Sequence, residues 1–249
     1  MRLRTVSDVV RGYRFTLFLG AVSVAAWTLM MLLPPAVIVA LCGWHSISEA
    51  AVAQASVAWA VTRPADIVIA VGLMTLLMTP LMAGPLRHVH QRSFAAYRGP
   101  LVVCFVTGYF GVWFGASAAA GTITVASHLI SGGGSIAPLL AIVAAIVWQG
   151  SPWKQLALNR CHRRLPLRAF GFVALRDAGW YGVRSASYCV MNCWPLMVAT
   201  MMVRLPDHSA MLAAVVFVTV ERLQPPRAPV WIVPGLGTGW LRSSSGTWR

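Results

Sequence analysis

A series of long apolar runs, separated by segments rich in arginine, constrains this chain more than any other feature. Only 10% of the residues are charged, whereas soluble domains carry about 25%. With so few charges and 58% hydrophobic residues, the chain could not cover its own surface in water. The sequence therefore predicts an all-α, polytopic membrane protein, a transmembrane helical bundle in contact with the lipid bilayer.

An α-helix needs roughly 20 mostly apolar residues to cross the hydrocarbon layer. The chain offers six candidate spans, and we expect them at residues 15–33, 66–86, 101–120, 136–148, 181–203 and 209–223. The fourth span is short, so we expect it to extend back through 122–130, across the glycines at 132–134. We expect a single integral-membrane domain at 1–223 and a disordered cytoplasmic tail, rich in Pro, Gly and Ser, at 224–249.

The basic residues predict the orientation of these spans. If the number of spans is even, all but two of the 20 Lys and Arg residues fall on one side, and the exceptions are Arg63 and Arg204. Because Lys and Arg are enriched on the cytoplasmic side, both termini are expected in the cytoplasm. The net charge of +14 then reflects topology. Contact with anionic lipid is a second interpretation, and the charge does not indicate nucleic acid.

A short helix is expected in the inner loop between spans four and five. Ser151 and Pro152 have the pattern of an N-cap followed by proline in the first turn. The helix would cover residues 153–163 and lie along the inner surface of the membrane as an amphipathic, interfacial element.

Four sulfur-bearing residues follow one another at intervals of four in the fifth span: Cys189, Cys193, Met197 and Met201. Residues four apart share a helix face, and each step turns by about 40° around the axis. Thiolate and thioether ligands favour Cu(I) over hard cations. The stripe therefore predicts a soft-metal site, while ordinary packing by Met and Cys is the competing interpretation.

The second span repeats this spacing with Met74, Met78 and Met82, and it is followed by the pair His88 and His90. Two methionine and cysteine stripes that face each other would suit Cu(I). The histidine pair could bind a metal if the chain is extended there, because alternate residues then share a face, whereas on a helix they diverge. Cys161, in the basic inner loop, is a further candidate ligand.

Several stretches occur in the order typical of one family: GYFGVWFG at 108–115, WQGSPWKQLALNRCHR at 148–163, YGVRSASYCVMNCWPLM at 181–197 and VERL at 220–223. Over residues 67–223 the chain resembles the bacterial predicted metal-binding integral membrane proteins, a family classed as a domain of unknown function. The resemblance implies an all-helical inner-membrane protein with a metal site that includes Cys189, Cys193, Met197 and Cys161. Asn192 stands where family members often have another cysteine, and the segment around Met78 also departs from the family pattern.

The leading hypothesis is a membrane protein that binds or handles a soft metal ion, with copper as Cu(I) the preferred ion, and that works with another membrane or periplasmic protein. One alternative is a non-catalytic helical subunit or assembly factor of a larger membrane complex. Another is a thiol redox protein that cycles Cys189 and Cys193. The chain lacks the motifs of nucleotide hydrolysis, zinc proteolysis and the common serine hydrolases, so an enzyme is not favoured.

Overall fold

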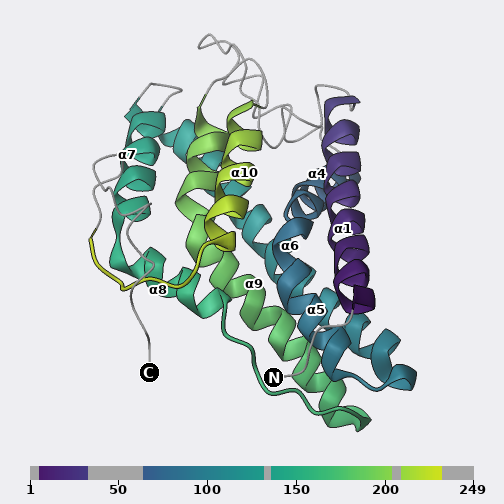
Figure 1. The fold of residues 1–249 in the computed structure, drawn as a ribbon. Helices are drawn as coiled ribbons and strands as arrows, with labels where there is room; N and C mark the ends of the chain where they lie inside the picture. Colours follow the sequence, from purple (N-terminus) through teal and green to yellow (C-terminus); the bar gives the residue numbers. More distant parts are fainter. Residues whose placement is uncertain (1–5, 33–63, 132–135, 204–208, 232–249) are drawn as a thin grey trace.

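The computed structural model describes residues 6–32, 64–131, 136–203 and 209–231 (Figure 1). Every long element in these ranges is a helix and none is a strand, which confirms the all-α class. The elements are α1 (Val6–Leu32), α4 (Pro64–Leu77), the 3₁₀ turn η1 (Thr79–Met82), α5 (Ala83–Arg92), the 3₁₀ turn η2 (Ala95–Tyr97), α6 (Arg98–Ser131), α7 (Ile136–Gly150), α8 (Pro152–Cys161), α9 (Gly171–Met202) and α10 (Ser209–Leu223).

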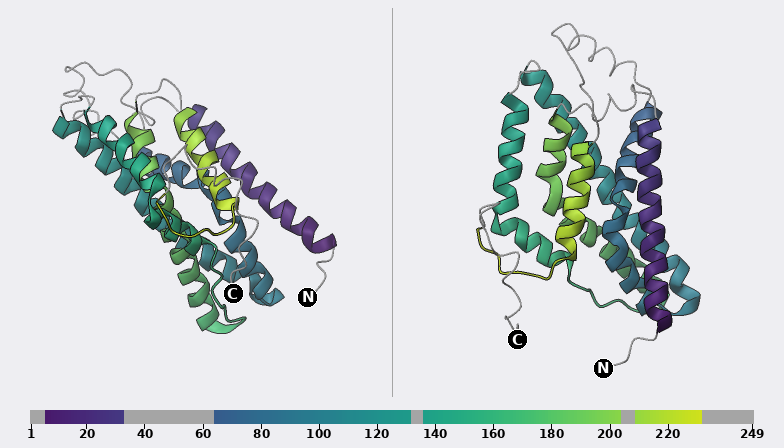
Figure 2. Two further views of the ribbon diagram at one scale, coloured as in Figure 1. Left: turned by 60° about the vertical axis from the view of Figure 1, so that its left-hand side comes forward. Right: turned by 45° about the horizontal axis from the view of Figure 1, so that its top comes forward.

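The long helices run in alternating directions along one bundle axis, as Figures 1 and 2 show. Helix α9 occupies the centre, and its contact with α6 is the most extensive between any two described elements. Helix α8 bends away from α7 by 65° and lies across the end of the bundle where α10 finishes. This arrangement brings α4, α6, α8 and α10 around the cysteine-bearing part of α9.

The prediction of six membrane spans is not supported by the length and composition of the described helices. One helical stretch, Ala95–Thr124, is long and apolar enough to cross a membrane, and a second is added if the bent pair α7 and α8 counts as one span. Helices α4 and α10 contain 14 and 15 residues, fewer than the roughly 20 that a span requires. Arg63, Arg204, the glycines at 132–134 and the tail from 232 lie outside the described residues.

Three predicted boundaries need correction. The second predicted span is interrupted after Leu77, where the turn η1 separates α4 from α5, because Pro80 cannot supply a backbone donor to a continuous helix. Residues 122–130 continue α6 and do not belong to the fourth span. Helix α9 begins at Gly171 rather than at 181, although Arg176, Asp177 and Arg184 make its first half polar.

The predicted cap of the inner-loop helix is confirmed. The Ser151 side chain accepts a hydrogen bond from the backbone N–H of Lys154 at 3.2 Å, and Pro152 occupies the first turn of α8. The buried residues of α8 recur at helical spacing: Lys154, Ala157, Leu158 and Cys161. Trp153, Leu156 and Arg160 are exposed, so the outer face of α8 combines two apolar side chains with one arginine.

Glycines allow α6 and α9 to approach backbone to backbone. A Cβ placed at Gly182 would lie 2.1 Å from the carbonyl oxygen of Phe105, and one at Gly108 would lie 2.4 Å from that of Gly179. Small residues permit this separation, as they do between helices that pack in lipid. The close approach buries Phe105, Tyr109 and Trp113 completely, each with 0% of its surface exposed.

Two side-chain hydrogen bonds connect α1 to the interruption of the second predicted span. Thr79 Oγ1 donates to the carbonyl oxygen of Leu19 at 3.0 Å, and Ser23 Oγ donates to that of Leu77 at 2.9 Å. Both bonds join side chains to backbone carbonyls more than 50 residues away in sequence. They hold the end of α4, and therefore Met78, against the bundle.

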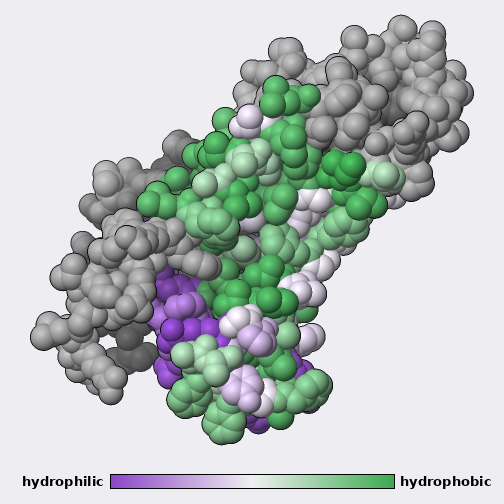
Figure 3. All heavy atoms as spheres, turned by 90° about the vertical axis from the view of Figure 1, so that its right-hand side faces the viewer, coloured by the Kyte–Doolittle hydropathy of each residue, from purple (hydrophilic) through white to green (hydrophobic). Residues whose placement is uncertain are grey.

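Large apolar side chains cover much of the described surface. Figure 3 shows an extended apolar area on one face, with hydrophilic residues gathered toward one end. On α7 the exposed set comprises Ile136, Leu139, Leu140, Ile142, Val143, Ile146 and Val147. Contiguous apolar patches of this kind mark surfaces that contact lipid or another protein.

Candidate metal centre

A small apolar pocket between α4, α9 and α10 is lined by five sulfur-bearing side chains: Met74, Met78, Cys193, Met197 and Met211. All five are buried, with between 1% and 7% of their surface exposed. Leu196, Thr200, Ala214, Val215 and Val218 complete the lining. We call this space the sulfur pocket. Its donors are almost all soft, which is the ligand chemistry that selects Cu(I).

The stripe of α9 is buried along its whole length, but its four members do not face the same neighbours. Cys193 and Met197 line the sulfur pocket, whereas Cys189 contacts Tyr109. Met201 accepts a hydrogen bond at 3.8 Å from the hydroxyl of Thr124 on α6. This division follows from helix geometry, since three steps of about 40° separate the first and last members by about 120°.

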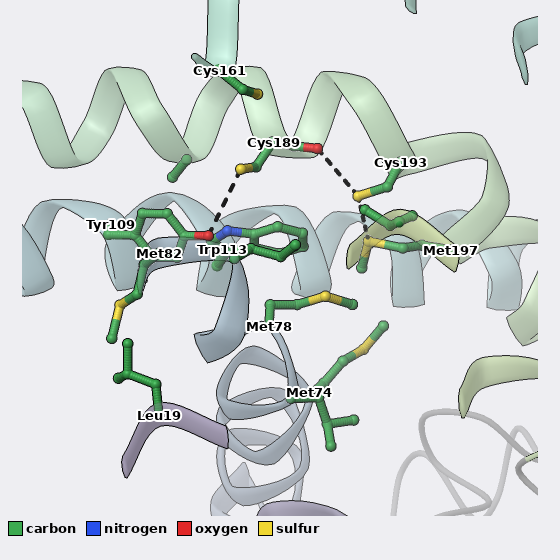
Figure 4. Packing of buried hydrophobic residues seen from close by; sticks show 14 of the residues in the cluster. Leu19, Met74, Met78, Met82, Tyr109, Trp113, Cys161, Cys189, Cys193 and Met197 are labelled. Atoms are coloured by element: carbon green, nitrogen blue, oxygen red, sulfur yellow. Dashed lines mark hydrogen bonds between the residues drawn. The ribbon is translucent and has the colours of Figure 1, made fainter. Parts of the chain in front are cut away.

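Methionines from the second predicted span approach Cys193 and Met197 from across the bundle (Figure 4). Met74 belongs to α4, and Met78 lies in the turn directly after it. Met82 is also buried but lies beside Leu19, away from the other two. The interruption at η1 therefore divides the predicted methionine stripe and leaves two of its members at the pocket.

The distance between two of the pocket sulfurs suits a shared ion. Cys193 Sγ lies 3.7 Å from Met197 Sδ and 3.2 Å from the carbonyl oxygen of Cys189. Two sulfurs that bind one tetrahedral ion at about 2.3 Å lie about 3.8 Å apart. The pair is thus close to the separation that binding to a common ion requires. The other pocket sulfurs are flexible thioethers able to adapt to the ion.

Cys189 lies in a polar cluster beside the pocket, and its sulfur accepts hydrogen bonds from three other elements. Tyr109 Oη on α6 donates at 3.8 Å, and Arg222 Nη1 on α10 donates as well. The third donor is the Cys161 thiol on α8. This hydrogen bond and then burial raise the pKa of Cys161 above its ordinary value.

A buried ion pair holds α8 against α10 next to this cluster. Lys154 Nζ contacts Glu221 Oε1, and their side chains are only 6% and 12% exposed. Burial lowers the pKa of the Lys154 ammonium, and the Glu221 carboxylate opposes that shift. His162 adds a second connection, because its Nε2 lies 2.9 Å from the carbonyl oxygen of Arg222. These contacts fix Arg222 relative to Cys161.

His88 and His90 lie on α5, a helix, so their side chains diverge. His88 is buried, with Nε2 2.9 Å from the carbonyl oxygen of Leu165 and its ring against Tyr181. The structure does not bring the two rings together, and their role as ligands stays a prediction. All four described cysteines are free thiols. Cys189 and Cys193 are buried, with 2% and 1% of their surface exposed.

Sequence reasoning missed three residues of this region: Met211, Tyr109 and Arg222. Met211 is one of several methionines with no regular spacing to the others, so no local pattern singles it out. Arg222 was counted among the topological arginines. The only available signal was its position in the VERL segment beside Glu221.

In the described ranges, no group of three or more His, Cys, Asp or Glu side chains is placed to hold a metal ion. Sites for zinc and for hard cations are built from such groups. The sulfur pocket differs because four of its five donors are thioethers. Its composition fits a soft monovalent ion and does not fit a hard divalent one.

The fold and the site define an all-helical protein with a buried centre made of thiol and thioether side chains. The family model described as "PpoB2: Copper chaperone" matches residues 67–242, and the chain belongs to this family. No curated protein and no solved structure matches the chain. The expected relation to a metal-binding family is thereby confirmed, and copper is the metal that the family description names.

Proposed function

We propose that this protein is an integral membrane protein that binds Cu(I) in the sulfur pocket and hands it to another membrane or periplasmic protein. The observation that carries the proposal is the convergence of five buried sulfur side chains from separate helices on one small space. Membership in a copper chaperone family supports copper as the ion.

The proposed role of each pocket residue follows from its chemistry. Among the described sulfur side chains that line the pocket, Cys193 is the one that carries a thiol, so it would supply a thiolate whose negative charge neutralises Cu(I). Met197 would bind on the same face of α9, one turn further along. Met74, Met78 and Met211 would complete the coordination from α4 and α10. Neutral thioethers bind weakly enough to release the ion to an acceptor with thiolates.

The exposed apolar side chains of α1, α6, α7 and α10 support location in a lipid bilayer, because water would not stabilise so large an apolar surface. Among the described residues, the segments that carry most of the basic side chains are α5, the loop after α8, the first half of α9 and the end of α10, and they gather toward one end of the bundle (Figure 1). This distribution supports cytoplasmic placement of that end. Six crossings in the inner membrane, with both termini inside, remain part of the proposal.

Copper content of the full-length protein tests the pocket. We would purify it in mild detergent, load Cu(I) anaerobically, remove excess ion and count copper atoms per chain. The double variant Cys193→Ser/Met197→Leu should hold one copper fewer than wild type. Cys104→Ser and Met191→Leu are matched controls, since Cys104 lies outside the pocket and Met191 is exposed on α9. Equal copper in the double variant and the controls would refute the pocket.

Extraction of membranes tests the location. An integral protein should stay in the membrane pellet after an alkaline carbonate wash and enter solution only with detergent. Release by carbonate alone would contradict this part of the proposal. Purification of the chain with one stable partner and no copper would favour a helical subunit of a larger complex.

A further inference from the structure

The polar cluster around Cys189 differs from the sulfur pocket in composition and in charge. Cys189 Sγ accepts hydrogen bonds from Tyr109, Arg222 and Cys161. None of these four residues lines the pocket. Figure 4 shows Cys161 approaching Cys189 from the side opposite the methionines. Two thiols from different helices, α8 and α9, therefore meet beside the pocket.

Arg222 is the cation of this cluster, and no carboxylate in the described residues faces it. The groups that act on its guanidinium are Cys189, Cys161 and Tyr109. Glu221, the next residue in the chain, is paired with Lys154. Arg222 Nη2 is buried and has no hydrogen-bond partner in the part of the chain that the structure describes. A buried guanidinium needs an anion beside it, and the sulfur that accepts its hydrogen bond is the group able to provide one.

This inference rests on the proposed function, which supplies Cu(I) as the ion. We propose that Cys161 and Cys189 form a second Cu(I) site, separate from the sulfur pocket, in which Arg222 serves as the permanent counter-ion. Soft thiolates are the preferred ligands of Cu(I). Tyr109 orients the sulfur of Cys189 and does not itself bind the ion.

The charge of the site stays constant when copper binds. One buried guanidinium balances one negative charge, so in the proposed free site the sulfurs of Cys161 and Cys189 share a single proton. On binding, the S–H bond of Cys161 breaks, its proton leaves to water, and both sulfurs form bonds to Cu(I). No electron is transferred. One Cu(I) between two thiolates again carries one negative charge, which Arg222 balances.

The same balance of charge between the two sulfurs and Arg222 makes the site selective for monovalent ions. A divalent ion between the two thiolates would give a neutral complex and would leave the positive charge of Arg222 buried without an anion. Such an uncompensated buried charge is strongly unfavourable. The site should therefore bind Cu(I), or Ag(I) as a probe of equal charge, and exclude Zn(II).

The two sites are adjacent, so ions can pass between them by ligand exchange. Cys189 and Cys193 are one helical turn apart, about 6 Å along the axis. The Cys193 thiol already contacts the carbonyl oxygen of Cys189. Cys161 is the last residue of α8, the helix that lies across the end of α10 in Figure 1. The thiol site would thus receive copper first and pass it to Cys193.

Copper stoichiometry of the full-length protein in detergent distinguishes the two sites. With a competing Cu(I) chelator and no oxygen, wild type and the Cys104→Ser control should each bind two Cu(I). Cys161→Ser and Cys189→Ser should each bind one. The pocket variant Cys193→Ser/Met197→Leu should also bind one, and X-ray absorption should then show two sulfur ligands. Two Cu(I) in Cys161→Ser would overturn the second site and leave the pocket intact. Two in the pocket variant would overturn the pocket instead.

The role of Arg222 is tested in the pocket variant, where only the thiol site remains. Arg222→Met should weaken Cu(I) binding at least about tenfold, because the complex then leaves its negative charge buried alone. Arg222→Lys keeps the charge and should retain most of the affinity. Zn(II) should not load either protein. Unchanged affinity in Arg222→Met, or stoichiometric Zn(II) binding beside Arg222, would overturn the counter-ion assignment. If Arg222→Met fails to fold, Arg222→Lys still provides a test, because it retains the positive charge. Its X-ray absorption spectrum should show copper bound by two sulfur ligands.

Discussion

Replacement of Gly182 by alanine should separate α6 from α9 and destabilise the protein. The added Cβ would lie 2.1 Å from the carbonyl oxygen of Phe105 and 3.0 Å from the backbone nitrogen of Tyr109. Backbone atoms of a packed helix cannot rotate away as a side chain can. Reaching the 3.4 Å at which ordinary contact begins requires an opening of about 1.3 Å between the two helices.

The opening weakens packing between α6 and α9, whereas the change from glycine to alanine raises helix propensity. Overpacking of this kind costs about 1–3 kcal/mol, and a gap of 0.5–1 Å already removes about a quarter to a half of each dispersion contact. The completely buried rings of Phe105, Tyr109 and Trp113 lie at this interface. Removing glycine from a helix returns about 0.8–1 kcal/mol. The net effect should be a destabilisation of up to about 2 kcal/mol.

Thermal unfolding in detergent, followed by circular dichroism, measures this effect. Gly111→Ala is the matched control, because Gly111 lies on α6 and its added Cβ would meet nothing within 4 Å. It should be as stable as wild type or more stable, since only the propensity changes. Gly182→Ala should melt at a lower temperature than both. If Gly182→Ala melts at or above the temperature of Gly111→Ala, the close-approach argument is wrong.

Two further substitutions test the contacts that position the site. Thr79→Val removes the buried hydrogen bond to Leu19 and should cost about 1 kcal/mol in thermal unfolding, whereas Thr28→Val, whose bond is exposed, should be nearly neutral; equal effects would contradict the role of the Thr79 bond. Lys154→Met leaves the Glu221 carboxylate buried alone and should cost about 3 kcal/mol, while Lys154→Met/Glu221→Leu should recover most of that loss. A double variant no more stable than the single one would show that the cost does not come from the unpaired charge.

The helices of this protein were largely predictable because their signals are local. Apolar runs and proline positions predicted the elements that became α1, α4, α6, α7, α9 and α10, and Ser151 with Pro152 predicted the start of α8. The extension of α6 through 122–130 was not predicted, because apolar periodicity alone does not show where one helix ends and the next begins. The interruption at η1 was not predicted either, since the apolar run continues through it and hydropathy does not reveal it.

The candidate site was predictable in its donors but not in their grouping. The spacing of Cys189, Cys193 and Met197 identified a sulfur stripe, and the stripe is buried. Only contacts between helices divide it into a pocket that includes Met211 and a cluster that includes Arg222. Those partners are distant in sequence, so no local pattern relates them.

The amino-acid sequence by itself determined the helical class, the sulfur chemistry and the basic character of particular segments. Each of these depends on residue type and short-range spacing. The tertiary structure alone decided which sulfurs face one another and which cation lies beside Cys189. Residues four apart on α9 differ in direction by about 40° around the helix axis, so its cysteines face different neighbours. The rotation and separation of the surrounding helices determine which residues those neighbours are.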